Sequence, residues 1–201
     1  MNFNVEDLKK HIPFYLTAAD QTALLAELKA FSAGNTPNYF LSDYNNAHKL
    51  EMLQGDGWPG LQLRLFHSGE RKTVRGVVLS NSCDMDSANK REISTRVVFA
   101  PLVKLAAYKE LLDESGIGPE KVEAKIVSIK AQKTTNIFYL PGNTPLNEDY
   151  IVRLDDLYSM PTTAHHGQPK WFTLSMAGFY LFVLKLSVHF CRLQENVTRS
   201  T

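Results

Sequence analysis

The chemically most versatile side chains of this chain stand together in Ser80-Asn81-Ser82-Cys83-Asp84, directly after an apolar run. Cys83 or a serine could act there as a nucleophile, or Asp84 as a base. Ser and Asp side chains also bond the local backbone in turns, and a cysteine often fills core space. The segment therefore favours a structural turn, with nucleophilic catalysis and non-catalytic binding as the alternatives.

A cysteine nucleophile needs a basic partner that lowers the pKa of its thiol. No histidine lies near Cys83 in the sequence, and only His67, across an expected hairpin, could approach it. A cysteine-dependent hydrolase is therefore the least favoured of the enzymatic interpretations.

The six histidines do not have the spacing that metal sites use. The sequence contains no His-x-x-x-His or Cys-x-x-Cys pair, and the adjacent His165 and His166 belong to a polar loop. It also lacks a Gly-x-Gly-x-x-Gly motif and a phosphate-loop lysine. We therefore expect no metal and no cofactor.

Basic side chains gather between residues 64 and 96, where seven bases against four acids give a local charge of +3. Such a cluster suits a phosphate groove, and it is also ordinary for exposed hairpin tips, so RNA or DNA is one expected partner class. The bases are Arg64, Arg71, Lys72, Arg75, Lys90, Arg91 and Arg96, and the acids are Glu70, Asp84, Asp86 and Glu92.

Composition and charge are those of an ordinary globular domain. The 201 residues are 44% hydrophobic and 21% charged, and the net charge of +1 gives no global attraction to nucleic acid or to membranes. The polar start has no signal-peptide pattern and the two cysteines are too few for a disulfide framework, so we expect a cytoplasmic protein. The apolar run 177–190 is short and interrupted by Lys185 and His189, which favours a buried helix over a membrane segment.

Hydrophobic periodicity and turn residues predict helices, then strands, then helices, then strands and a last helix. This order is typical of an α+β domain with a small antiparallel sheet or an SH3-like barrel. The expected helices are 5–11, 17–34, 103–114, 119–132 and 175–195, and the expected strands are 61–65, 74–80, 95–102, 136–140 and 150–154.

We expect one domain over residues 1–201. An N-terminal helical segment (1–34) precedes a barrel core (50–160), into which two helices are inserted at 103–132. A C-terminal helix at 172–196 carries aromatic side chains around most of its circumference, which predicts burial in the core or, as the alternative, contact with a second copy or a partner protein.

The order of motifs resembles that of the PemK/MazF-like toxins, which are small β-barrels. Gly55-Asp56 is similar to their early Gly-Asp, and Arg75-Gly76-Val77-Val78-Leu79-Ser80 to their Arg-Pro-Val strand, with glycine in place of proline. The strand 95–101, ending in Ala-Pro, and the segment 152–157 resemble later motifs. The Ser-x-Ser-Cys-Asp variant also resembles uncharacterised bacterial proteins, and the likeness covers residues 54–102 and 136–160.

In those toxins an arginine and a Ser or Thr promote metal-free RNA cleavage by the ribose 2′-hydroxyl. The resemblance implies these roles for Arg75 and Thr95, a guanidinium stabilising the phosphate and a hydroxyl positioning it. It also implies a bacterial setting of the toxin–antitoxin or defence kind.

Two functional hypotheses follow. The favoured one is a non-catalytic binding or assembly module that grips a protein partner, a second copy or nucleic acid, with Ser80, Ser82, Cys83, Asp84 and Arg96 as binding residues. The alternative is a metal-independent endoribonuclease in which Arg75 and Thr95 converge on one phosphate-sized site. Both require the strands 74–80 and 95–102 to be neighbours.

Overall fold

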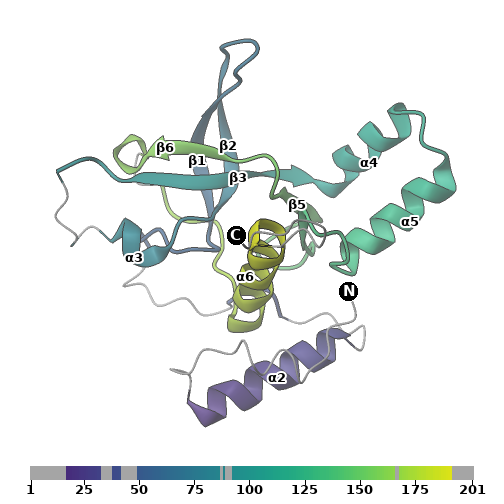
Figure 1. Cartoon of the computed structure of the whole chain (residues 1–201), viewed down its shortest axis with the longest axis horizontal. Helices are drawn as coiled ribbons and strands as arrows, with labels where there is room; N and C mark the ends of the chain where they lie inside the picture. Colours follow the sequence, from purple (N-terminus) through teal and green to yellow (C-terminus); the bar gives the residue numbers. More distant parts are fainter. Residues whose placement is uncertain are drawn as a thin grey trace, which may run out of the picture.

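The strand β3 (Arg96–Lys104) joins the two halves of the sheet. It pairs antiparallel with β2 (Arg71–Val78), with Val78 opposite Phe99, which confirms that the two expected strands are neighbours. β6 (Tyr158–Pro161) pairs with the first half of β3, and β5 (Tyr150–Arg153) pairs with the second half. The computed structural model, an α+β fold, describes residues 17–32, 38–41, 49–86, 88, 92–165 and 168–191 (Figure 1).

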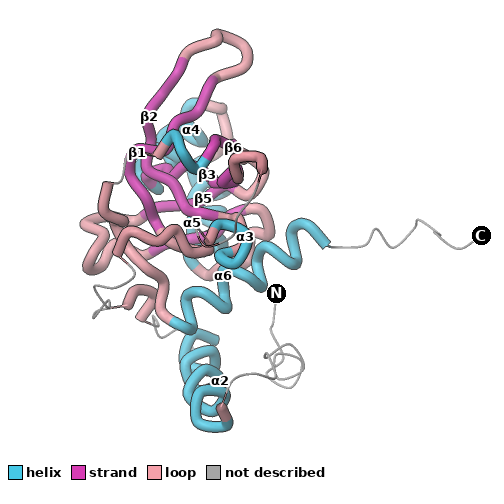
Figure 2. Tube along the Cα trace, turned by 90° about the vertical axis from the view of Figure 1, so that its left-hand side faces the viewer, coloured by secondary structure: helices cyan, strands magenta, loops and turns pink. Residues whose placement is uncertain are grey.

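The strand order is β1-β2-β3-β5-β4, with β6 beside β3. β1 (Gly57–Arg64) forms a long hairpin with β2, and β4 (Ile137–Leu140) pairs with β5. The outer part of the β1–β2 hairpin, residues 64–72, extends away from the rest of the molecule, and we call it the arm (Figures 1 and 2).

The sheet curls without closing. The backbone N–H of Gln62 in β1 donates to the Sδ atom of Met160 in β6 at 3.2 Å, so these outer strands approach each other around a small core. That core holds Trp58, Leu61 and Phe99. Among the strands that the structure describes, β1 and β6 share no backbone ladder, so the structure confirms the antiparallel sheet but not the expected barrel.

Helices cover the sheet from two sides. α4 (Leu105–Glu114) and α5 (Pro119–Lys130) are the inserted pair, and they pack on β4 and β5 through a second core that includes Ile129 and Ile151. α6 (Met176–Cys191) lies against the main core, and α2 (Ala18–Ser32) contacts α6 on its other side (Figure 2). The expected helix 5–11 and the residues after Cys191 lie outside the described part.

Four local predictions need correction. The polar turn after β2 contains a short helix, α3 (Ser82–Met85), and a 3₁₀ turn follows β6 at Thr162–Ala164. The strand β6 was not expected, because its sequence, Tyr-Ser-Met-Pro, is short and ends in proline. The first strand begins at Gly57 instead of residue 61, because Gly60, with a φ of 76°, allows the irregular register between Trp58 and Leu61.

The last helix begins at a cap that the sequence predicts. The Oγ atom of Ser175 accepts a hydrogen bond from the backbone N–H of Gly178 at 3.1 Å. Phe182 and Leu181 are buried, whereas Phe190 at the far end is 54% exposed. The described helix therefore belongs to the core for most of its length, which confirms the first of the two alternatives. Its Lys185 is also buried, and the Nζ atom donates to the backbone carbonyls of Thr134 and Ile137.

Gly178 is required where α6 crosses the segment before the sheet. A Cβ atom at this position would lie 2.5 Å from the carbonyl oxygen of Tyr39, which is backbone and cannot turn away. Alanine normally stabilises a helix interior by about 1 kcal/mol relative to glycine. Here we expect Gly178→Ala to destabilise the protein by about 2 kcal/mol, because the overlap must be relieved by backbone movement. Urea unfolding measures this change in the free energy of unfolding.

The matched control is Gly118→Ala, since a Cβ atom at Gly118 meets nothing within 4 Å. Because Gly118 is the N-cap of α5, where alanine is less favourable than glycine, that substitution should lower the free energy of unfolding by no more than about 1 kcal/mol. Equal effects of the two substitutions would contradict the role assigned to the helix crossing.

Burial lowers the pKa of Lys185 to about 8. Between pH 8 and the ordinary value of 10.5, the unfolded chain therefore binds more protons than the folded one, and stability rises as the pH rises through this window. From pH 7 to pH 9.5 we expect Lys185 to raise the free energy of unfolding by about 2 kcal/mol. The measurement is the difference between the wild-type protein and Lys185→Met in urea unfolding at each pH.

Lys121→Met removes an exposed lysine from α5 and serves as the control. Its pH profile should run parallel to that of the wild-type protein. If the Lys185→Met profile also runs parallel, the folded chain does not perturb this ammonium group.

Candidate functional site

The turn after β2 uses its polar side chains to hold neighbouring segments. The Oγ atom of Ser80 accepts a hydrogen bond from the backbone N–H of Val98 in β3 at 2.8 Å. The Oγ atom of Ser82 accepts one from the backbone N–H of Gln54 at 2.9 Å. Asn81 caps α3 by accepting from the backbone N–H of Cys83 at 2.9 Å. These bonds agree with the structural turn that the sequence favours.

Cys83 and Asp84 both lie on the surface. The expectation that Cys83 fills core space is therefore wrong, because the one-turn helix α3 turns this residue outward. His67, the partner considered for a thiolate, is in the turn of the β1–β2 hairpin, at the far end of the arm from α3 (Figure 1). The structure does not bring the two residues of the Cys–His hypothesis together.

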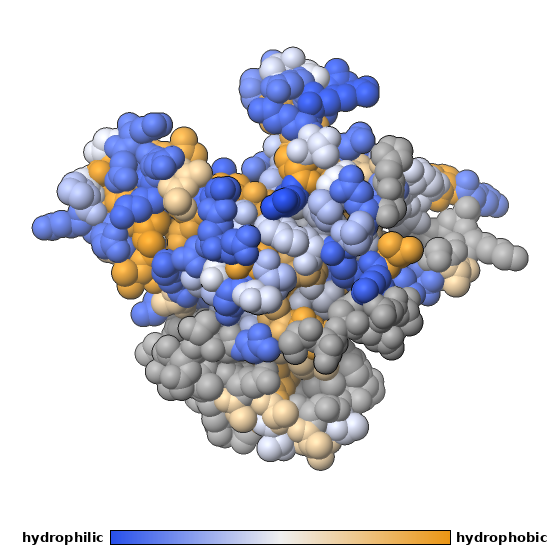
Figure 3. Space-filling view, turned by 180° about the vertical axis from the view of Figure 1, so that it is seen from behind, coloured by the Kyte–Doolittle hydropathy of each residue, from blue (hydrophilic) through white to orange (hydrophobic). Residues whose placement is uncertain are grey.

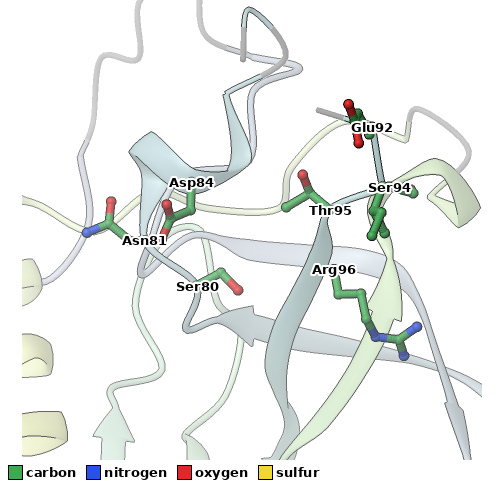
Figure 4. Close-up of a pocket in the computed structure, with 8 residues that line it drawn as sticks. Ser80, Asn81, Asp84, Glu92, Ser94, Thr95 and Arg96 are labelled. Carbon is green, nitrogen blue, oxygen red and sulfur yellow. The ribbon is translucent and has the colours of Figure 1, made fainter. Parts of the chain in front are cut away.

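An open pocket of about 700 Å³ lies between this turn and the start of β3. Figure 4 shows Ser80, Asp84 and Thr95 around it, whereas the side chain of Arg96 runs along β6 instead. There Arg96 donates from Nη2 to the carbonyl oxygen of Ser159 at 2.8 Å. Because the lining also contains Glu92, it carries two carboxylates against this one guanidinium, which disfavours a phosphate.

Arg75 and Thr95 lie at opposite ends of β3. The β2–β3 register pairs Gly76 with Pro101, and its extension sets Arg75 opposite Leu102. Thr95 is seven residues from Leu102 (102 − 95), which corresponds to about 23 Å along an extended strand. The expected convergence of these two side chains on one phosphate is therefore wrong, because an antiparallel register moves their strand ends apart.

The side chain of Arg75 lies over the indole ring of Trp171, with the Cζ atom 4.2 Å from the ring centroid. Tyr150 packs edge-on against the same ring, with the centroids 5.4 Å apart. Near them Lys104 forms an ion pair with Glu148 at 2.7 Å, which raises the pKa of the lysine. The guanidinium of Arg75 is thus part of an aromatic stack on the sheet surface.

The Gly55-Asp56 motif has a structural role that the sequence does not reveal. Asp56 is 1% exposed and pairs with Lys170, with 2.5 Å between Oδ2 and Nζ. The carboxylate also accepts a hydrogen bond from the backbone N–H of Leu53 at 3.2 Å. Burial raises the pKa of Asp56, and the nearby ammonium of Lys170 opposes that rise. Gly-Asp-Gly is an ordinary turn sequence, and the partner of Asp56 is 114 residues further along the chain, so the sequence does not indicate the buried pair.

Comparisons with known proteins add no family. No protein-family model matches this chain, and no curated protein matches it either. Within the described ranges, no helix is long and apolar enough to cross a membrane. The same ranges hold no group of three His, Cys, Asp or Glu side chains placed to bind a metal ion.

The buried pair of Asp56 and Lys170 makes a clear thermodynamic prediction. Lys170→Met leaves a buried carboxylate without its cation, and should cost about 3–5 kcal/mol of unfolding free energy. Asp56→Asn should be similarly costly. The double variant should be more stable than the sum of the single effects by at least about 2 kcal/mol, because neither charge then remains unpaired. Urea unfolding of the four proteins gives this coupling energy.

The exposed pair of Lys109 and Glu123, 3.1 Å apart, provides the control cycle. The coupling energy of Lys109→Met with Glu123→Gln should be below about 1 kcal/mol, because water screens this pair. Additive effects at Asp56 and Lys170 would show that their charges do not stabilise each other.

Proposed function

We propose that this protein is a non-catalytic binding module, and that its arm binds single-stranded nucleic acid. The observation that carries the proposal is the charge arrangement of the arm. Arg64 and Arg71 stand directly opposite each other in the β1–β2 register. Like charges in directly opposed positions destabilise a hairpin, so this pair favours a bound anion between the two guanidinium groups.

The rest of the arm suits the same partner. Lys72 is a third cation, on the opposite face of the hairpin from the two arginines and 3.6 Å from Glu70, the one acid of residues 64–72, so the arm carries a net charge of +2 (3 − 1). Hydrophilic side chains cover its tip (Figure 3). Phe66 is nevertheless fully exposed there. Cations that track a phosphate backbone, together with an aromatic ring on which a base can stack, are the elements of single-strand binding.

Backbone hydrogen bonds close the tip of the arm. The backbone N–H of Leu65 donates to the carbonyl oxygen of Glu70 at 2.8 Å, and that of Gly69 to the carbonyl oxygen of Leu65 at 2.7 Å. Gly69 has a φ of 69°, a conformation in which glycine is favoured. The closed turn therefore holds Phe66 and the arginines on one short element.

Several observations favour binding over catalysis. Arg75 and Thr95 lie about 23 Å apart along β3. The hydroxyls of Ser80 and Ser82 accept hydrogen bonds from the backbone of neighbouring segments. We also propose that this module has a PemK/MazF-like origin and acts in a bacterial toxin–antitoxin or defence system, on the strength of the sequence resemblance alone.

Assembly with a partner protein or a second copy remains a prediction. The large apolar side chains that are exposed outside the arm lie on several elements, three of them on the α4–α5 hairpin (Leu111, Ile117 and Val127) and the others at Leu41, Leu50, Ile93, Met176 and Phe190. A stable interface needs a contiguous patch, whereas the arm combines charge and an aromatic ring within nine residues.

The test is the binding of a fluorescein-labelled oligouridine of about 20 nucleotides, long enough for one binding module, measured by fluorescence anisotropy. We expect Arg64→Gln/Arg71→Gln to weaken binding at least tenfold at low salt. The slope of log affinity against log salt should fall by about 1.4, since each phosphate contact on a single strand contributes about 0.7. Phe66→Ala should weaken binding without changing this slope, because stacking releases no counterions.

Lys121→Gln/Lys125→Gln removes the same charge from α5 and should leave the affinity nearly unchanged. Equal losses in this control and in the arm variant would mean that only net charge matters. Absence of binding by the wild-type protein at about 50 mM salt would refute the proposal. Cleavage of the oligouridine by the wild-type protein, lost in Arg75→Ala, would instead support the endoribonuclease alternative.

A further inference from the structure

A second cavity lies on a different part of the molecule from the pocket beside the 80–84 turn. Three segments and the separate residue Lys49 line it, and we call it the Trp171 cavity; the segments are residues 38–41, the loop at 143–145 and residues 169–173. Its volume is about 720 Å³, within the range of about 300–1,000 Å³ in which proteins bind small molecules.

The walls of the Trp171 cavity are aromatic and held in place by their neighbours. Trp171 is covered by Arg75 and packs against Tyr150, as described above. Phe172 packs edge-on against Phe40, with the ring centroids 5.2 Å apart. The backbone N–H of Leu41 donates to the carbonyl oxygen of Thr173 at 3.0 Å, which ties two of the lining segments together. Aromatic side chains that are already held in place favour a planar or apolar ligand body, because their ordering on binding costs little conformational entropy.

The third lining segment is also fixed. The backbone N–H of Leu146 donates to the carbonyl oxygen of Asn143 at 2.6 Å, and the side chain of Leu146 is buried in the main core. On the other side of this loop, the backbone N–H of Gly142 donates to the Oδ1 atom of Asp149 at 2.8 Å. The three lining segments are therefore each anchored to the fold, and Lys49 is the exposed part of the lining.

The charges of the lining have one sign. Two of the lining residues are lysines, Lys49 and Lys170, and none is an acid. The carboxylate of Asp56 lies behind the lining and pairs with Lys170, whereas Lys49 is exposed to solvent. The pocket beside the 80–84 turn has nearly the same volume but two acids and no aromatic wall. Of the two, the Trp171 cavity suits an organic anion.

We propose that the Trp171 cavity binds a small organic anion with an aromatic or apolar body. The ligand body lies against Trp171, the half-buried aromatic ring of the lining, and its acidic group faces Lys49. This site lies apart from the arm and does not depend on nucleic-acid binding.

The experiment compares two probes that differ in charge. The anionic 8-anilino-1-naphthalenesulfonate should bind the folded protein at one site, and the uncharged N-phenyl-1-naphthylamine should bind the same site more weakly. Lys49→Gln should weaken the anionic probe about threefold to tenfold and leave the uncharged probe unchanged. Leu41→Trp, which enlarges a side chain at the lining, should weaken both probes. Both affinities come from fluorescence titration.

The place of binding is read separately by nuclear magnetic resonance. Protein labelled with ¹⁵N-tryptophan gives one indole N–H signal for each tryptophan, and Trp171→Phe assigns them. The anionic probe should shift the Trp171 signal and leave that of the buried Trp58 in place.

The control for Leu41→Trp in the fluorescence titration is Leu111→Trp, an equal enlargement on α4, which should leave the affinities of both probes unchanged.

Three outcomes would overturn the proposal. The anionic probe could fail to bind the folded protein, it could bind without moving the Trp171 signal, or Leu41→Trp could leave both affinities as they were. Because none of these readouts involves the arm, their failure is distinct from a failure to bind the oligouridine.

Discussion

The two-sided pairing of β3 is the constraint on which the rest of the structure depends. The first half of β3 pairs with β6 and the second half with β5. Its middle, residues 99–101, also pairs with β2, which connects β3 to β1. This register fixes the 80–84 turn at one end of β3 and Arg75 at the other. A slip by one residue would put the exposed Arg96 and the half-buried Val98 where the buried Val97 and Phe99 now lie, so the core fixes the register. The same register keeps Arg75 and Thr95 apart, which a toxin-like active site would need close together.

Buried charges join parts of the chain that are far apart in the sequence, and the first pair lies beside the β-bridge between Gly57 and Phe172. Asp56 before β1 is held to Lys170 before α6, and Lys185 within α6 binds the carbonyls at the start of β4. Each buried ion costs desolvation free energy and is tolerated only with good partners. Both lysines have such partners in segments far away in the sequence. Charges of this kind specify where α6 docks, because an apolar helix face alone would pack in several rotations.

The sequence predicts the α+β class, the main strands and the inserted helices because alternation and helical periodicity act locally. It does not predict β6, since four residues ending in proline give no period to detect. The prediction of the catalytic site is wrong for a different reason. Arg75 and Thr95 look suitable by residue type, but whether two side chains converge depends on a register between distant segments. Likewise Cys83 looks like a core residue until the short helix α3 turns it outward.

The arm differs from the rest of the fold in what its residues contribute. Of the arm residues only Leu65 packs against the small core around Trp58, since the buried residues of β1 and β2 lie mainly toward the base of the hairpin. Residues that add nothing to the core are free to vary, so folding does not require two arginines to face each other there. Local arrangements that oppose stability concentrate at functional positions, because selection for binding retains what selection for folding would remove. Arg64 and Arg71 are therefore stronger indicators of a binding function than the polar turn, because the hydroxyls of Ser80 and Ser82 already bond to the backbone.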